Sequence, residues 1–171
     1  NGDIWTGADA LEMMAHTGAD GVVVGRGCLG RPWLFSQLAA AFAGEELPTE
    51  PRLGRVLEIL RRHAELLSLD YGEAKGCRDM RKHMAWYLKG FSVPHTVRQP
   101  LGTVQTLAEL DALLAQINPD QDFNSEVGAG PRGRTSGGRR PSLPDRWLES
   151  CELTAEDRVN VSLAELSVSG G

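Results

Sequence analysis

The chain of 171 residues has few of the features that mark secreted, membrane-spanning or zinc-binding proteins. Its three cysteines are an odd number at wide spacing, which argues against a disulfide framework and against a zinc site. No apolar run approaches the roughly 20 residues that a membrane-spanning helix needs. The first residues show no signal-peptide pattern, and the four histidines lack metal-ligand spacing. We therefore expect a monomeric, cytoplasmic protein with neither a membrane nor a metal ion as a partner.

The net charge of −5 is distributed unevenly along the chain. Residues 1–51 carry 2 basic and 7 acidic side chains, residues 52–98 carry 10 and 5, and residues 99–171 carry 6 and 11. An acidic protein thus has a basic middle. A local excess of cations can face a polyanion such as a nucleic acid, although a solvated helical surface gives the same pattern.

The first 43 residues show the alternation of an α/β protein. "NGDI" resembles the end of a strand, and Thr6 with Asp9 forms a capping-box pattern that predicts a helix over about residues 8–16. "GVVV" predicts a buried strand, and Pro32 suits the first turn of a second helix. Two strands about 20 residues apart around a helix have the spacing of a parallel pair. Because two strands do not form a stable sheet, this stretch is expected to be the last part of a larger domain.

Residues 52–118 follow a linker, "GEELPTEP", and show helical periodicity. One helix is predicted from Arg52 to a stop at Gly72. Prolines 94 and 100 are expected to bound a turn, and "TLAELDALLAQI" predicts a last amphipathic helix. Between them a helix is predicted from about residue 74 to 90, with an apolar face of Cys77, Met80, Met84, Leu88 and Phe91. We expect these helices to be the most ordered part of the chain.

The composition changes after Pro119. "EVGAGPRGRTSGGRRPSLP" is rich in glycine, proline, serine and arginine and offers little to bury. We expect residues 119–171 to be mostly disordered, with "DRWLES" docking briefly or not at all.

The segment "GVVVGRG" raises the first functional hypothesis, because a buried strand stops on an arginine between two glycines. In parallel α/β folds, ligands bind at the carboxyl ends of the strands. Gly25 and Gly27 would let backbone N–H groups approach an anion closely, and Arg26 adds a guanidinium for phosphate oxygens. The helix after Pro32 could add its positive end. The alternative is a tight turn whose arginine faces water.

Two further groups lie near this predicted phosphate site. Asn1 and Asp3 are polar groups at the other strand end, where they could bind a sugar or ribityl chain or only cap the following loop. Cys28 adjoins the loop, but no base is visible beside it, and a small buried cysteine is the simpler interpretation.

The predicted helix over residues 74–90 carries its cations on the side opposite its apolar face. Trp86 lies beside them and His83 flanks them. An aromatic residue among cations suits base stacking and phosphate contact in RNA. The alternatives are that Trp86 packs against the preceding domain and that the charges form a solvated face. We call these cations the basic stripe: Lys75, Arg78, Lys82 and Lys89.

Three motifs, "NGDI", "TGADGVVVGRGCLGRPWLF" and "RDMRKHMAWYLKG", in this order and spacing, resemble the carboxyl-terminal half of bacterial B-type tRNA-dihydrouridine synthases. The resemblance covers about residues 1–118. It implies an α/β part, residues 1–43, comprising the last strands and helices of an FMN-binding (β/α)8 TIM barrel. It also implies an all-α part, residues 52–118, which is a small helical domain that binds tRNA. In that family NAD(P)H reduces the flavin, which reduces uridine to 5,6-dihydrouridine while a cysteine acid supplies a proton.

Transferred residue by residue, the resemblance implies that Asn1, Gly2 and Asp3 line the FMN site. It also implies that Gly25 and Arg26 hold the FMN phosphate. The basic helix with Trp86 corresponds to the part of the helical domain that faces tRNA.

The sequence also departs from the family pattern. The catalytic cysteine of the family lies in a "PC" segment after an early barrel strand, and no such segment is present here. We therefore expect a fragment that is inactive alone. Two other functions stay open: another FMN- or phosphate-binding TIM-barrel oxidoreductase, for which a basic helical domain has no use, or a helical RNA-binding module without catalysis, which would bind no flavin.

Overall fold

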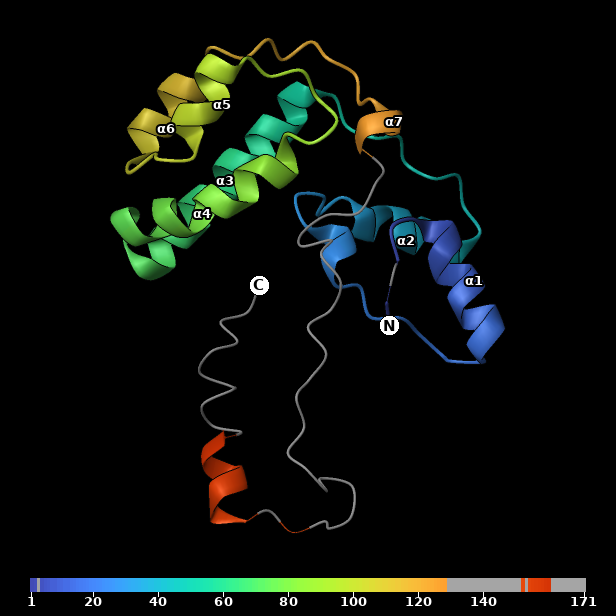
Figure 1. The fold of residues 1–171 in the computed structure, drawn as a ribbon. Coiled ribbons are helices and arrows are strands. Elements are labelled where there is room, and N and C mark those ends of the chain that lie inside the picture. Colours follow the sequence, from blue (N-terminus) through green and yellow to red (C-terminus); the bar gives the residue numbers. More distant parts are fainter. Residues whose placement is uncertain (3, 129–151, 153, 161–171) are drawn as a thin grey trace. The chain divides into compact units, whose positions relative to one another are not determined.

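The structure is a computed structural model and describes residues 1–2, 4–128, 152 and 154–160 (Figure 1). The chain divides into two compact units, residues 1–132 and residues 133–171. Among the described residues of the first unit there are helices and connecting segments but no β-strand. The elements are α1 (Gly7–Thr17), the 3-10 helix η1 (Arg26–Cys28), α2 (Leu34–Ala43), α3 (Leu53–Tyr71), α4 (Glu73–Tyr87), α5 (His95–Leu101), α6 (Leu107–Leu114) and α7 (Ser125–Gly128).

Helix α1 confirms the capping box. The Thr6 hydroxyl accepts a hydrogen bond from the Asp9 N–H at 3.1 Å, and the Asp9 carboxylate accepts one from the Thr6 N–H at 2.8 Å. The helix ends at Gly18, which adopts the left-handed conformation with φ 69° and donates its N–H to the Met14 carbonyl. Local capping chemistry therefore sets both ends of α1.

The strand predicted for residues 21–24 does not form in this structure, so that prediction was wrong. The side chains nevertheless alternate between inside and outside, as they would in a strand. Val22 and Val24 pack towards Ile4 and the first turns of α2, while Val23 is 68% exposed. A strand needs the backbone groups of neighbouring strands to complete its hydrogen bonds. The described residues provide no such neighbour, and the segment forms no ladder.

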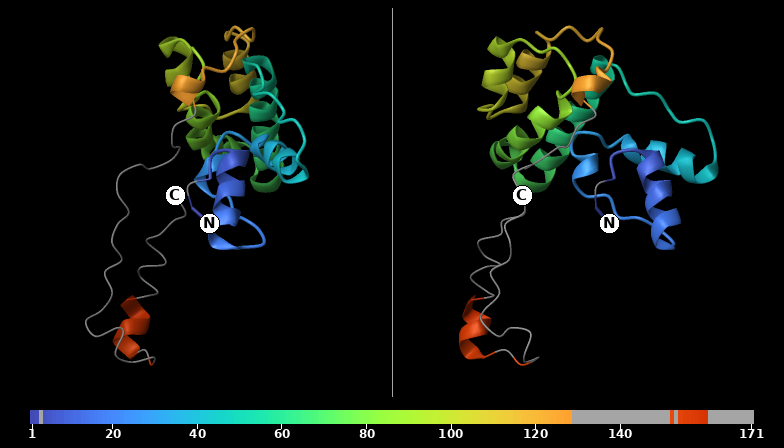
Figure 2. Two further views of the ribbon diagram at one scale, coloured as in Figure 1. Left: turned by 90° about the vertical axis from the view of Figure 1, so that its right-hand side faces the viewer. Right: turned by 45° about the vertical axis from the view of Figure 1, so that its right-hand side comes forward.

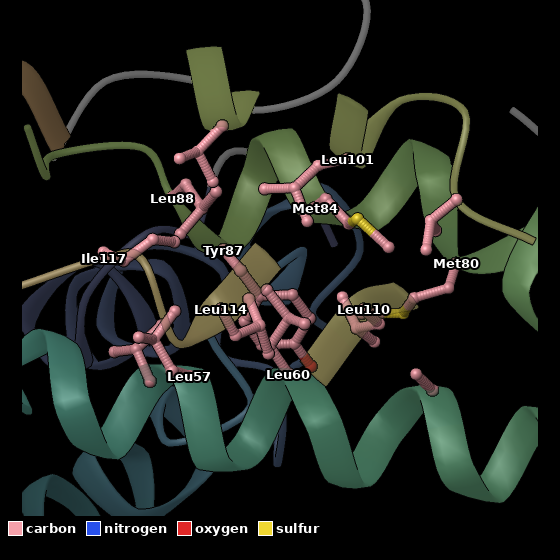
Figure 3. Close-up of a cluster of buried hydrophobic side chains, with 14 of the residues drawn as sticks. Leu57, Leu60, Met80, Met84, Tyr87, Leu88, Leu101, Leu110, Leu114 and Ile117 are labelled. Carbon is pink, nitrogen blue, oxygen red and sulfur yellow. The ribbon is translucent and has the colours of Figure 1, made fainter. Parts of the chain in front are cut away.

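Helices α3 and α4 form a hairpin that contains most of the core, and they lie side by side in Figures 1 and 2. Gly76 lets them approach, since a Cβ there would lie 2.5 Å from the backbone nitrogen of Ser68. The apolar face predicted for α4 is confirmed: Figure 3 shows Met80, Met84 and Leu88 pointing into one cluster with side chains of α3, α5 and α6, and Cys77 and Phe91 are also buried.

Residues 94–101 differ from the turn predicted from their two prolines. Pro94 is the N-cap of α5, and Pro100 lies within its last turn. The helix is seven residues long and is held by Val97 and Leu101, which are one turn apart and buried in the main core. The free energy gained by burying this short apolar face outweighs the cost of the backbone hydrogen bond that Pro100 cannot donate.

The segment after Pro119, expected to be part of a disordered tail, packs against the helices as far as residue 128. The first N–H groups of α3 have no partner within the helix. Leu53 donates to the Gln121 carbonyl at 2.9 Å, and Gly54 donates to the Pro119 carbonyl at 3.0 Å. The Phe123 ring also packs on Phe91, with centroids 5.7 Å apart. The tail therefore caps α3, which has no side-chain cap of its own.

The second unit is described at residues 152 and 154–160 only. Residues 155–160 are helical, and Thr154 and Asp157 form a reciprocal cap at their start. A part of the tail expected to be disordered thus has a local helix signal that the composition concealed. The segment "DRWLES" and most of the glycine- and proline-rich run lie outside the described residues.

Candidate functional site

Two segments border one cavity of about 270 Å³: residues 1–2 and 4–5, the first segment, and residues 21–26, the second segment. Asn1 and Gly2 contribute from the first segment, and Gly25 and Arg26 from the second. The structure therefore brings together the residues that the sequence placed at neighbouring strand ends. Asp3, predicted for the same site, lies outside the described residues. We call this space the Arg26 cavity; Ile4, Trp5, Val23 and Gly27 complete its lining.

The two glycines beside Arg26 differ in what surrounds them. A Cβ on Gly27 would lie 1.9 Å from the carbonyl oxygen of Ile4, so only glycine allows the loop to approach the first segment this closely. A Cβ on Gly25 would meet nothing within 4 Å, so this position faces open space at the cavity. The loop is therefore held against the first segment at Gly27 and is accessible at Gly25 and Arg26.

The backbone around Arg26 forms a 3-10 turn in place of a strand end. Cys28 donates its N–H to the Gly25 carbonyl at 3.3 Å, and its thiol donates to the same oxygen at 3.1 Å. Gly25, Arg26 and Gly27, at the start of this turn, line the cavity. The first turn of α2 contributes none of the described lining residues, so the start of η1 forms this wall of the cavity in place of the helix end that the sequence suggested.

A partly buried ion pair holds this region together. Arg31 is 4% exposed as a residue. Its guanidinium donates to the Trp5 carbonyl at 3.1 Å and pairs with the Glu50 carboxylate. The other Glu50 oxygen accepts from the Trp33 indole N–H at 2.6 Å. Arg31 thus joins Trp5, which lines the cavity, to Glu50 in the linker before α3. Sequence reasoning missed this pair because its partners are 19 residues apart without a helical or strand period.

The basic stripe lies on the exposed side of α4. Lys75, Arg78 and Lys82 are exposed, whereas Lys89 is half-buried. Lys75 pairs with Asp79 at 2.5 Å and lies over the Tyr71 ring at 4.2 Å. Within the described residues Arg78 and Lys82 form no ion pair. By contrast, Arg55 and Arg62 of α3 each pair with a glutamate three residues on, at 2.7 Å.

Trp86 belongs to a row of rings on α3 and α4. Its indole is half-buried and packs edge-on against His83 with centroids 5.0 Å apart, and His83 packs on His63 at 4.9 Å. Burial lowers the pKa of His83 to about 4, helped by the charges of His63 and Lys82. Burial also raises the pKa of Tyr87 to about 12, and the Tyr87 hydroxyl lies 3.2 Å from His63 Nδ1. These groups are neutral near pH 7.

The histidines and cysteines offer no metal centre in the part of the chain that the structure describes, where no three potential ligands gather. In the same part, no helix combines the length and apolar character that crossing a bilayer requires. Cys77 is buried on the apolar face of α4, and burial raises the pKa of its thiol, which fits a core residue.

The described residues thus form a cavity lined by glycines and Arg26, and a helical hairpin whose helix α4 carries exposed cations. Residues 1–126 match the family described as "Dihydrouridine synthase (Dus)". The chain belongs to the dihydrouridine synthase family.

The curated relatives agree with this assignment. The chain is 51% identical over 172 residues to a "Probable tRNA-dihydrouridine synthase" of Mycobacterium leprae, covering 100% of this chain and 43% of the relative. It is 53% identical over 148 residues to a protein of the same name from Mycobacterium tuberculosis strain H37Rv, covering 86% and 38%. To "tRNA-dihydrouridine synthase B" of Pasteurella multocida it is 34% identical over 128 residues, covering 72% and 39%. The chain thus spans about two fifths of the length of these relatives.

Proposed function

We propose that this chain is the part of a tRNA-dihydrouridine synthase that holds the phosphate of FMN and contacts tRNA. The observation that carries the proposal is the Arg26 cavity, where Asn1 and Gly2 lie beside Gly25 and Arg26. In the whole protein, residues 1–43 would be the last strands and helices of a (β/α)8 barrel, and residues 52–118 a helical domain. The segment 21–24, which forms no ladder here, fits this proposal, because its pairing partners would be other barrel strands.

The described residues fit a flavin phosphate. Gly25 gives open access, the start of η1 brings its backbone to the cavity, and Arg26 supplies a cation. Asn1 would hydrogen-bond the ribityl chain, and Asp3 is assigned there by family resemblance alone. When bound, FMN reduced by NAD(P)H would supply the reducing power that converts uridine to 5,6-dihydrouridine. The residues of this chain would bind and orient; the proton-donating cysteine is proposed to lie in the part of the synthase that this chain lacks.

The RNA side of the proposal rests on the contrast between α4 and α3. Arg55 and Arg62 of α3 each pair with a glutamate of their own helix, and Arg61 pairs with Asp111 of α6. By contrast, Arg78 and Lys82 present exposed charge without an ion pair in the described part of the chain. Charges of this kind track a phosphate backbone without reading its sequence. We propose that the basic stripe and Trp86 face tRNA.

The first test is flavin content. The full-length synthase that contains this chain should purify yellow and release FMN on denaturation, and Arg26→Ala should retain less FMN after dialysis than the wild type. A matched control is Arg55→Ala, which removes an exposed arginine away from the cavity. A full-length protein that is colourless and takes up no added FMN would refute the enzymatic proposal.

A further inference from the structure

The loop from residue 25 to residue 30, the glycine loop, contacts the rest of the protein on both sides. On one side Gly27 lies against the Ile4 carbonyl of the first segment. On the other side Gly30 lies against helix α4, at the peptide between Trp86 and Tyr87. The loop that lines the Arg26 cavity therefore touches the helix that carries the basic stripe.

The contact at Gly30 excludes any side chain. A Cβ there would lie 2.3 Å from the Trp86 carbonyl carbon, 2.5 Å from the Tyr87 nitrogen and 2.6 Å from the Trp86 oxygen. These are backbone atoms of a helix, so they cannot rotate away as the end of a flexible side chain could. Gly30 also has φ +65°, a left-handed conformation that side chains disfavour. A larger residue must displace the loop from α4.

A displacement at Gly30 would reach the cavity, because the loop is internally bonded. Leu29 donates its N–H to the Arg26 carbonyl at 3.2 Å, and Cys28 donates both its N–H and its thiol to the Gly25 carbonyl. Arg31, next in sequence, is fixed by Trp5 and Glu50. A shift of Gly30 should therefore be transmitted through the loop to Arg26.

We propose that Gly30 is a positioning residue for the phosphate site, whose contact with α4 sets the placement of Gly25 and Arg26. The helical domain thereby becomes a structural support of the cofactor site as well as an RNA-facing surface. This inference rests on the proposed function, since it assumes that the Arg26 cavity holds the FMN phosphate.

The test compares two ligands that differ only in the phosphate. The Kd values of FMN and of riboflavin are measured by flavin fluorescence on the flavin-free full-length synthase, for the wild type, Gly30→Ala and Gly21→Ala. Gly21 is the matched control, because a Cβ there would meet nothing within 4 Å. We expect Gly30→Ala to lower the preference for FMN over riboflavin about tenfold or more, as expected for the loss of one hydrogen bond to a charged group. Gly21→Ala should keep the wild-type preference.

The ratio separates positioning from general damage, because a merely destabilised protein would weaken both ligands equally. If Gly30→Ala does not fold, Cys28→Ala takes its place, since it removes the thiol bond to Gly25 without adding bulk; the FMN preference should fall while Cys28→Ser keeps it. An unchanged ratio in Gly30→Ala would overturn the proposal. An unchanged ratio in Cys28→Ala would also overturn it, by showing that the bonds within the loop, which carry a displacement from Gly30, do not place Gly25. If the wild-type protein binds FMN no better than riboflavin, the cavity does not hold the phosphate. That result would refute the proposed function of the cavity and not only the role of Gly30.

Discussion

The basic stripe leads to a prediction about the salt dependence of tRNA binding. The ion pairs in the structure indicate which of its cations should affect that dependence most. If Arg78 and Lys82 contact tRNA phosphates, each releases counterions on binding, and the logarithm of the binding constant falls with the logarithm of salt concentration. Removing one such contact should flatten this slope by about 0.7 to 0.9, and removing both by about twice that amount. Lys75→Ala should change the slope less, because Asp79 already compensates its charge at 2.5 Å.

The assay is tRNA binding by the full-length synthase across a range of salt concentrations. The variants are Arg78→Ala, Lys82→Ala and the double variant, and the matched control is Arg62→Ala. Arg62 is also an exposed helical arginine, but Glu65 pairs with it at 2.7 Å. We expect the control slope to equal that of the wild type. Equal slopes for the wild type and the double variant would show that the stripe is a solvated face that makes no contact with tRNA phosphates.

Three further predictions concern individual groups. Glu50→Gln should lower the free energy of unfolding by about 3–5 kcal/mol in urea titrations, because it leaves the Arg31 guanidinium buried without its counter-charge; an effect no larger than that of exposed Glu58→Gln would contradict this. His83 has a folded-state pKa near 4, below the ordinary value of 6.5, so the unfolded chain binds more protons between these pH values. Stability should therefore fall as the pH drops from about 6.5 to about 4, and a urea-midpoint profile that stays the same in His83→Asn would exclude this cause. Trp86→Ala should cost about 1–3 kcal/mol of tRNA affinity with an unchanged salt slope if the indole stacks on a base; a lowered melting temperature with unchanged affinity would make Trp86 a packing residue.

Local chemistry made much of the helical part predictable. The capping box of Thr6 and Asp9 and the left-handed Gly18 are short-range signals, and α1 begins and ends within a residue of its prediction. The apolar face of α4 was predicted because burial on one side of a helix imposes a 3.6-residue period, and Met80 and Met84 are buried accordingly.

The errors of sequence reasoning occurred where distant partners decide the structure. "GVVV" has strand chemistry, but hydrogen-bond partners determine whether a strand forms. The prolines at 94 and 100 suggest a turn, yet burial of Val97 and Leu101 stabilises a helix between them. The segment 119–124 is polar in composition, but two of its carbonyls cap α3 from far along the chain. Leu53 donates to the Gln121 carbonyl, 68 residues away, and Gly54 donates to the Pro119 carbonyl, 65 residues away.

The sequence predicted residues that line the candidate site, but it did not predict the contacts that hold them in place. The sequence identified Asn1, Gly25 and Arg26 as neighbours at two segment ends, and the structure places all three around one cavity. It gave no signal that Gly30 touches α4 or that Arg31 pairs with Glu50, because both contacts join segments whose approach depends on the fold. Glycines in a loop are visible in a sequence, whereas the atoms they make room for are not.

The most direct test of the account is the reaction itself. Unmodified tRNA is incubated with the full-length synthase that contains this chain, with FMN and with NADPH or NADH, and its nucleosides are analysed by mass spectrometry. We predict that a uridine gains two hydrogens in the presence of FMN. We also predict that Arg26→Ala needs more FMN to reach the same yield. A flavin-loaded wild-type protein that reduces small substrates but forms no dihydrouridine in tRNA would contradict the first prediction.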